Sequence, residues 1–240
     1  MLIDNKINRE NHSVNGLGLC LQPIIYRNRV GEKLQEFEVL LRGKRTLKFP
    51  KDEFEYLIQN NQKNSLLMEW LAEKIRSILE VHSNYVLCVN LNPEQFLFES
   101  TWVYLMELQM FSSNMKIEVT EHISKTGMVD RIKLVDSITD IKMMGYEIAI
   151  DDVGTGQNTL LFVLDNILQI KRLKLSLVPL ARLNKESIIL LLRFWKSIAD
   201  KHGLEFVVEG IDSEKLSDMV LKLGIELQQG FLWEDKFENV

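Results

Sequence analysis

The 240-residue sequence is poor in the residues that form cross-links or soft metal sites. It contains only two cysteines, Cys20 and Cys88, which lie far apart and show no Cys-x-x-Cys or Cys/His ligand spacing. A disulfide framework and a zinc site are therefore not indicated, and we expect both thiols to be buried and reduced. The four histidines lack His-x-x-x-His spacing, so we expect them on the surface or in loops: His12, His82, His122 and His202.

Long apolar runs and an excess of positive charge are missing as well. The first residues, MLIDNKINRENHSVNG, are polar, and no later run approaches the roughly 18 apolar residues of a membrane span. The 34 acidic residues outnumber the 29 basic ones and give a net charge of −5, which disfavours binding along the phosphates of DNA or RNA. We therefore predict a cytoplasmic protein that neither crosses a membrane nor binds nucleic acid, whereas a small anionic ligand held through metal remains compatible.

No Pro/Ser-rich linker, low-complexity segment or internal repeat divides the chain, which has only four prolines. A hydrophobic content of 46% is sufficient for a large core, and one α/β barrel commonly occupies this length. We predict a polar N-terminal segment over residues 1–18 and a single barrel over residues 19–240.

Short runs rich in β-branched and apolar residues predict eight strands, at 17–25, 34–41, 85–91, 115–120, 146–151, 173–178, 205–211 and 227–233. Apolar residues at helical spacing predict helices between most of them, at 52–61, 64–81, 93–110, 129–144, 158–170, 184–202 and 213–223. This alternation favours a parallel (β/α) barrel. The first two strands are joined by YRNRVGEK, which is too short for a crossover helix, so we expect that pair to be antiparallel.

Polar side chains stand at the carboxyl end of almost every predicted strand. They are Glu38, Asn90, Glu118 with Glu121, Asp151 with Asp152, Lys174, Glu209 and Gln229. Any one of them has an ordinary alternative as a helix N-cap, a turn residue or a solvated loop residue. In a barrel, however, the strand ends meet at one face, where active sites lie. The convergence of these residues therefore predicts an active site.

A cluster of carboxylates at one barrel mouth indicates metal. The carboxylates would repel one another and raise each other's pKa unless cations neutralised them. Hard oxygen ligands without His or Cys favour Mg²⁺ or Mn²⁺ over zinc. A pair of such ions suits the in-line hydrolysis of a phosphodiester.

The motifs that contain these residues resemble those of a known family. The run Glu38-Val39-Leu40-Leu41-Arg42 resembles the Glu-Ala-Leu-Leu-Arg signature of EAL domains, with Val in place of Ala. From about residue 19 the family's motifs follow in order: LQPII, FEVLLR, VNLN, IEVTE, IDDVGTG, a lysine-containing strand, VVEG and QQGFLW. Eight ordered matches are specific where a single one would not be. The resemblance implies a modified TIM (β/α)8 barrel with an antiparallel first strand, and hydrolysis of the cyclic dinucleotide c-di-GMP to linear pGpG with Mg²⁺ or Mn²⁺.

The resemblance also implies roles for single residues. The metal ligands would be Glu38, Asn90, Glu118, Asp151, Asp152 and Glu209. Catalysis would involve Lys174, Glu209 and Glu121, of which Glu121 would brace the loop 152–156. Substrate contacts would come from Gln22, Arg42 and Gln229, because a guanidinium suits a phosphate and an amide suits a guanine edge.

The catalytic lysine can be aligned in two registers. An ungapped alignment from Asp151 puts Arg172 at the lysine position, whereas two extra residues put Lys174 there. We favour Lys174, because an amine beside metal cations can have a lowered pKa and arginine essentially cannot deprotonate. In the favoured register Ser176 replaces an aspartate of the family pattern.

Three functions remain open from the sequence. The first is an active phosphodiesterase. The second is an inactive EAL domain that binds c-di-GMP or another protein, which the change at Ser176 favours. The third, a barrel enzyme for another phosphodiester such as a glycerophosphodiester, would need histidines in catalytic places. The resemblance further implies a homodimer formed through the loop and helix after Asp152.

Overall fold

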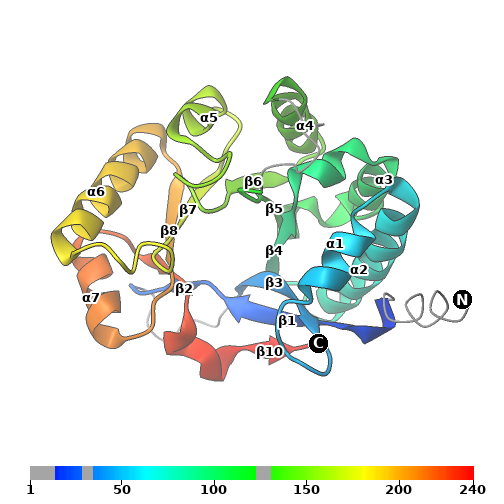
Figure 1. Ribbon diagram of the computed structural model, residues 1–240, viewed down its shortest axis with the longest axis horizontal. Coiled ribbons are helices and arrows are strands. Elements are labelled where there is room, and N and C mark those ends of the chain that lie inside the picture. The colour runs from blue at the N-terminus through cyan, green and yellow to red at the C-terminus, as the bar shows by residue number, and fades with distance from the viewer. Residues whose placement is uncertain (1–13, 29–34, 123–130) are drawn as a thin grey trace, which may run out of the picture.

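The computed structural model describes residues 14–28, 35–122 and 131–240, with no account of the side chains of residues 131 and 132. The described residues form a ten-stranded sheet that curls into a barrel with helices around its outside (Figure 1). Seven strands are parallel neighbours in chain order: β3 (Glu36–Gly43), β4 (Val86–Leu91), β5 (Met115–Val119), β6 (Glu147–Ile150), β7 (Arg172–Ser176), β8 (Glu205–Glu209) and β9 (Leu227–Gln228). The predicted fold class, a modified TIM barrel, is confirmed.

The remaining strands close the barrel with antiparallel pairs. β1 (Leu17–Pro23) runs antiparallel to β3, with Gln22 opposite Glu38, so the expected orientation of the first pair is confirmed. The chain then bends at Ile24, whose N–H donates to the Glu36 carbonyl, and continues as β2 (Ile25–Tyr26) against β9. A last strand that was not predicted, β10 (Glu238–Asn239), adds to the other side of β1.

Helices follow the strands and cover the outside of the barrel. They are α1 (Lys51–Leu57), α2 (Asn61–Val81), α3 (Glu99–Glu107), α4 (Arg131–Met143), α5 (Leu160–Asp165), α6 (Lys185–His202) and α7 (Glu214–Lys222), with short 3-10 turns η1 (Val14–Gly16), η2 (Pro93–Leu97), η3 (Gln109–Asn114) and η4 (Phe231–Lys236). Among the described residues, no helix has both the length and the apolar character needed to cross a membrane.

The longer helix α6 illustrates why the sequence folds in this way. Asn184 caps its first turn by accepting a hydrogen bond from the Ser187 N–H at 2.9 Å. Its buried residues Leu192, Trp195 and Ala199 recur every three or four positions and face the sheet. Gly203 ends the helix in the left-handed conformation, with φ of 68°.

Three differences between predicted and observed elements have a clear physical cause. The predicted helix 93–110 is divided into η2, α3 and the start of η3, since Pro93 begins a separate turn. The predicted helix 158–170 contains only α5, because the Asn166 side chain donates to the Phe162 carbonyl and the helix ends there. The predicted strand 227–233 ends at Gln228, and at Gly230 the chain passes so close to Ile211 that a Cβ would lie 2.1 Å from the Ile211 oxygen.

The interior of the barrel contains buried charge as well as apolar side chains. On β7, Arg172 and Lys174 both have a relative exposure of 0% and point inward two residues apart. The apolar core lies mainly between the strands and the surrounding helices. Cys20 and Cys88 are buried free thiols, as predicted, and His82, His122 and His202 are exposed, while His12 lies outside the described residues.

Candidate active site

Lys174 stands at the centre of a cluster of carboxylates inside the barrel. Its Nζ lies 2.8 Å from Glu38 Oε2, 2.6 Å from Glu118 Oε2 and 2.7 Å from Glu209 Oε1. Asp151 Oδ1 is slightly farther, at 3.7 Å. Five strands, β3, β5, β6, β7 and β8, therefore place polar side chains at one point, as predicted from the convergence of strand ends in a barrel.

Glu38 is held from several sides. Besides Lys174, the amide groups of two predicted site residues donate to it: Asn90 Nδ2 to Oε1 at 2.6 Å and Gln229 Nε2 to Oε2 at 2.6 Å. The Gln229 amide also donates to Gln22 Oε1 at 3.2 Å. Gln229 is thus buried among side chains of the cluster, and its observed contact is with Glu38.

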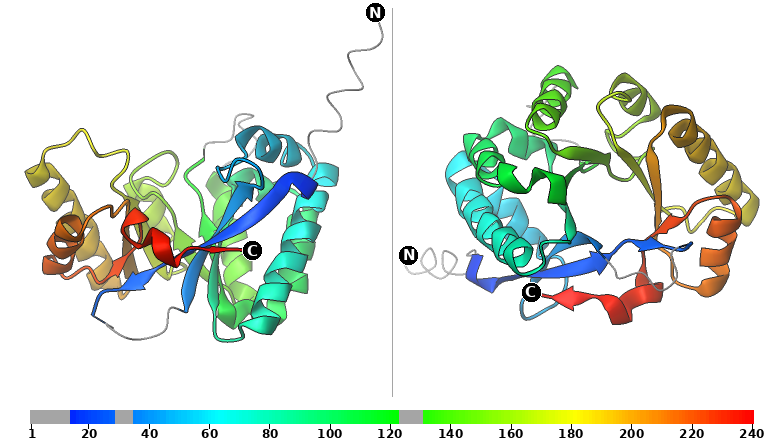
Figure 2. Two further views of the ribbon diagram at one scale, coloured as in Figure 1. Left: turned by 90° about the horizontal axis from the view of Figure 1, so that it is seen from below. Right: turned by 180° about the vertical axis from the view of Figure 1, so that it is seen from behind.

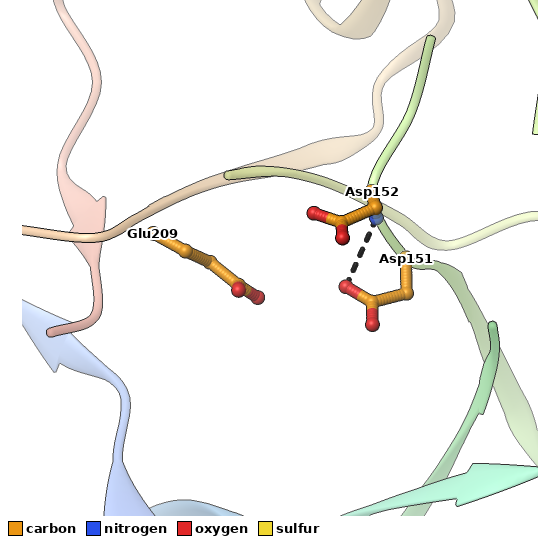
Figure 3. A group of neighbouring side chains, drawn as sticks. All are labelled: Asp151, Asp152 and Glu209. Atoms are coloured by element: carbon orange, nitrogen blue, oxygen red, sulfur yellow. Dashed lines mark hydrogen bonds between the residues drawn. The ribbon is translucent and has the colours of Figure 1, made fainter. Parts of the chain in front are cut away.

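Asp151, Asp152 and Glu209 make a second grouping beside Lys174. One carboxylate oxygen from each lies within 4.8 Å of the others, and Figure 3 shows Glu209 extending toward the Asp pair. The Asp152 N–H donates to Asp151 Oδ1 at 3.0 Å (Figure 3), while Asp152 itself has a φ of 44°. Asp tolerates this left-handed conformation better than most residues, and it directs the two neighbouring carboxylates toward the same region.

The carboxylates perturb one another's pKa in the expected direction, with one exception. Burial raises the pKa of Glu209 to about 7 against the opposing charge of Lys174, and burial also raises the pKa of Glu118 and of Asp151. For Glu38, burial is outweighed by the Lys174 charge and by hydrogen bonds from Lys174 and two amides, so its pKa is lowered. Burial raises the pKa of Asp152 in the same way. The prediction of raised values is thus confirmed for four carboxylates and wrong for Glu38.

The expectation of a lowered pKa for Lys174 applies to an amine beside metal cations, and the carboxylates by themselves act in the opposite direction. Burial disfavours its charged form, but Glu118, Glu209 and Glu38 outweigh burial and raise the pKa of Lys174 well above its usual value. With carboxylates alone around it, this side chain is an ammonium ion that neutralises the cluster.

The donor atoms of the site fit a hard divalent cation. Asn90 Oδ1, Glu118 Oε1 and Asp152 Oδ1 are buried and accept no hydrogen bond from the described residues. Buried oxygens without a donor are unfavourable unless a ligand satisfies them. Carboxylate and amide oxygens, together with the Asp151–Asp152–Glu209 grouping, are the donor set that Mg²⁺ or Mn²⁺ takes.

The structure distinguishes the positions of Arg172 and Lys174, the two residues that the alternative alignments of β7 put at the lysine position. Arg172 lies two residues nearer the opposite end of the barrel, with Nη1 2.6 Å from Glu36 Oε1 and Nη2 2.6 Å from Glu205 Oε2. Lys174, not Arg172, is therefore the cation that contacts the strand-end carboxylates.

A cavity of about 960 Å³ opens beside these residues. Arg42, Asn90, Asp151 and Asp152 are part of its wall, and its far side is formed by apolar residues of α1, α2 and η2. Arg42 is half-buried and donates from Nη1 to the Leu41 carbonyl at 3.0 Å. The site is thus joined to a space large enough for a dinucleotide-sized ligand.

Glu121 also faces this cavity, and its contact with the following loop runs through the backbone. The Glu121 carbonyl accepts from the Gln157 N–H at 3.1 Å, while Glu121 Oε1 lies 3.8 Å from His122 Nδ1. The backbone therefore connects β5 to the loop after β6.

Two kinds of site residue could not be identified from the sequence. Asn158 fastens the loop after β6, with Nδ2 donating to the Val119 carbonyl at 3.1 Å and to the Asp151 carbonyl at 2.5 Å. Phe54, Gln59 and Glu94 line the cavity from α1, the turn after it and η2. Nothing in their local sequence marks them, because their place in the wall depends on how helices pack on the barrel.

The comparisons with known proteins identify the family. A family model for the EAL domain matches residues 5–235. The chain belongs to the EAL domain family.

Relatives with described activities are distant and mostly longer. The cyclic di-GMP phosphodiesterase PdeA of Borreliella burgdorferi is 22% identical over 176 residues, which covers 71% of this chain and 25% of PdeA. The chain spans less than half the length of the curated relatives it matches.

Solved structures share the fold. The PaMucR phosphodiesterase in complex with c-di-GMP superposes with a TM-score of 0.67 at 25% identity, covering 90% of this chain and 95% of that chain. BlrP1 of Klebsiella pneumoniae in a calcium/c-di-GMP complex gives a TM-score of 0.73 at 21% identity, covering 92% of this chain and 56% of BlrP1.

Proposed function

We propose that this chain is a metal-dependent phosphodiesterase that hydrolyses c-di-GMP to linear pGpG. The observation that carries the proposal is the grouping of Glu38, Glu118, Asp151 and Glu209 around Lys174, with Asn90 hydrogen-bonded to Glu38. A cavity of about 960 Å³, whose wall includes Asn90 and Asp151, lies beside this cluster. The named activity of PdeA and the c-di-GMP complex of PaMucR support the substrate.

In this proposal the strand-end oxygens hold two divalent cations, Mg²⁺ or Mn²⁺, through Glu38, Asn90, Glu118, Asp151, Asp152 and Glu209. When bound, such ions supply Lewis-acid polarisation of a phosphodiester and favour deprotonation of water. BlrP1 structures determined with manganese and with calcium support this cofactor class.

The chain's own residues then bind and orient the dinucleotide. Arg42 contacts a phosphate from the cavity wall, and Gln22 contacts the guanine or ribose side of the ligand. Gln229 holds Glu38 in place, as its 2.6 Å hydrogen bond already does. Lys174 keeps its proton on Nζ, neutralises the carboxylates and orients the attacking water.

A second function, c-di-GMP binding without turnover, is favoured by one observation. Lys174 already makes close contacts with three carboxylates, and Ser176 leaves one acidic side chain fewer than the family pattern. If the ammonium keeps cations out, the cavity would still accept the dinucleotide.

The deciding experiment incubates the purified chain with c-di-GMP and Mg²⁺ or Mn²⁺ and resolves the products by chromatography. We expect pGpG from the unmodified chain, and none with EDTA or in Glu38→Ala. Glu73→Ala, which removes an exposed carboxylate of α2, should keep full activity. Absence of pGpG with either metal, together with calorimetric binding of c-di-GMP, would move the assignment to the receptor.

We also propose that two copies pair through α5 and the loop before it. Leu161 and Leu164 of α5 are exposed by 64% and 40%, an apolar surface that a partner would cover. Analytical ultracentrifugation should show twice the 28.0 kDa chain mass, and a monomer at every concentration tested would reject the pairing.

A further inference from the structure

A strongly basic segment joins β3 to α1. Residues 42–51 read RGKRTLKFPK and contain five basic residues and no acidic one, in a chain whose net charge is −5. Lys44, Arg45, Lys48 and Lys51 are exposed, and Arg42 is half-buried. We call residues 42–51 the basic rim.

The rim has a defined backbone but little neutralising charge. The Gly43 N–H donates to the Lys48 carbonyl at 2.8 Å, which closes the loop into a tight turn. Lys44 Nζ donates to a neutral group, the Asn15 carbonyl, and Lys51 lies 3.9 Å from Glu55. Within the described part of the chain, neither Arg45 nor Lys48 forms an ion pair, so both remain available to an anion.

Three residues of the rim line the same cavity as the carboxylates, and Arg45 and Lys48 lie between them in the chain. Arg42, Phe49 and Lys51 line that cavity on one side, and Asp151 and Asp152 line it on another. In the side view of Figure 2, β3 runs toward the end of the barrel at which α1 lies. The cavity therefore has a basic part at the rim, with Glu55 beside Lys51, and an acidic part at the strand ends.

This asymmetry matters for an anionic ligand. A cyclic dinucleotide has two phosphodiester groups, each with one negative charge, and the acidic side and the negative chain both repel it. A cluster of positive charge at the mouth of a site raises the local concentration of an anion and accelerates association. The rim, which reaches this cavity through Arg42 and Lys51, supplies such a cluster.

We propose that Arg45 and Lys48 of the basic rim capture the cyclic dinucleotide electrostatically and guide it into the cavity. This inference rests on the proposed function and adds a determinant of substrate capture outside the metal and substrate residues named above. It makes Arg45 and Lys48 specificity-determining residues for a dianionic ligand, with no part in bond cleavage.

An anionic membrane is the main competing partner, since Leu47 and Phe49 of the rim are exposed by 66% and 50%. One observation favours the dinucleotide. The Phe49 ring packs 5.4 Å from that of Phe54, and both line the cavity, so Phe49 belongs to the cavity wall.

The test compares two variants with the same change in net charge. Arg45→Gln with Lys48→Gln removes the rim charge, and Lys201→Gln with Lys222→Gln removes two exposed charges from the last turns of α6 and α7. At low salt we expect the rim variant to have an unchanged kcat and a KM about tenfold higher, in the range of electrostatic steering. The difference should vanish near 1 M salt, where the Debye length is about 3 Å. The matched variant should behave as the unmodified chain does.

Equal KM values for the rim variant and the unmodified chain at low salt would overturn the inference, as would an equal loss in the matched variant. Loss of sedimentation with phosphatidylglycerol vesicles without a change in KM would also overturn it, in favour of a lipid contact. If the unmodified chain forms no pGpG, the proposed function fails by itself. The capture of c-di-GMP is then judged by calorimetry on the same variants, where a rim variant with unchanged affinity rejects it.

Discussion

At the scale of single residues, the stability of the barrel interior depends on two buried, positively charged side chains of one strand. Lys174 and Arg172 are fully buried, and each neutralises at least two carboxylates. A buried charge is tolerated when it is paired and costly when its partner is removed. The two side chains should therefore be equally necessary for stability, although only Lys174 touches the candidate metal site.

We predict that Lys174→Met lowers the free energy of unfolding by roughly 3–5 kcal/mol in EDTA, because it leaves buried carboxylates without a counter-charge. Divalent cations should restore much of this loss by taking over the neutralising role, about 2.7 kcal/mol at a hundredfold excess over Kd. Urea denaturation with and without Mg²⁺ measures both effects.

Arg172→Met provides the control for this prediction. It should cost a similar amount of stability in EDTA, yet gain no more than the unmodified chain from Mg²⁺, since Glu36 and Glu205 lie at the other end of the barrel. If Mg²⁺ restored the stability of both variants equally, the assignment of the divalent metal site to the Lys174 cluster would be contradicted.

At the scale of elements, the loop between β6 and α5 positions Asp151 and Asp152. It is fixed by the Asn158 side chain and by the hydrogen bond from the Gln157 N–H to the Glu121 carbonyl. Gly156 lies very close to the backbone that follows β5. A Cβ at this position would lie 2.1 Å from the carbonyl oxygen of Glu121. The absence of a side chain at Gly156 is therefore a condition for this loop position.

We predict that Gly156→Ala displaces the loop and lowers both stability and hydrolysis. The left-handed φ of 47° contributes about 1 kcal/mol of the cost, and the collision with Glu121 adds the rest. Gly203→Ala is the matched control, since Gly203 has a φ of 68° and nothing within 4 Å of the added Cβ. Thermal unfolding and product formation should show the larger loss at Gly156; equal losses would exclude the collision as the cause.

At the scale of the whole molecule, an ion network joins strands around the barrel. Glu36 of β3, Lys116 of β5, Arg172 of β7 and Glu205 of β8 contact one another, with Lys116 Nζ 3.0 Å from Glu36 Oε1 and 3.3 Å from Glu205 Oε2. Burial alone would raise the pKa of Glu36, but Arg172 and Lys116 lower it to about 2. This network links elements that are far apart in the sequence.

The network predicts a loss of stability in acid. Because the pKa of Glu36 in the folded chain lies below its ordinary value of 4.5, its contribution is complete above pH 4.5 and is lost as the pH falls toward 2. Between pH 6 and pH 3 the loss from this group alone is about 2 kcal/mol. Urea denaturation at both pH values should show a steeper decline for the unmodified chain than for Glu36→Gln; parallel declines would contradict the prediction.

The order of elements and the types of residue at the site could be predicted from the sequence. Alternating strand and helix patterns predicted the barrel, and the short connection after Tyr26 predicted the antiparallel first pair, because these are properties of local spacing. Glu38, Asn90, Glu118, Asp151 and Glu209 were recognised because strand ends of a barrel meet at one face.

Only the tertiary structure decided questions that depend on neighbours distant in the sequence. The placement of Lys174 rather than Arg172 among the carboxylates follows from the inward-facing positions of β7, and the raised pKa of Lys174 follows from three carboxylates on other strands. The strand β10, the link from Glu121 to the loop after β6, and the cavity between the basic rim and the acidic strand ends likewise require the closed barrel. Local sequence determines which groups exist and on which elements they lie, whereas packing determines which of them share one low-dielectric space and so set each other's charge.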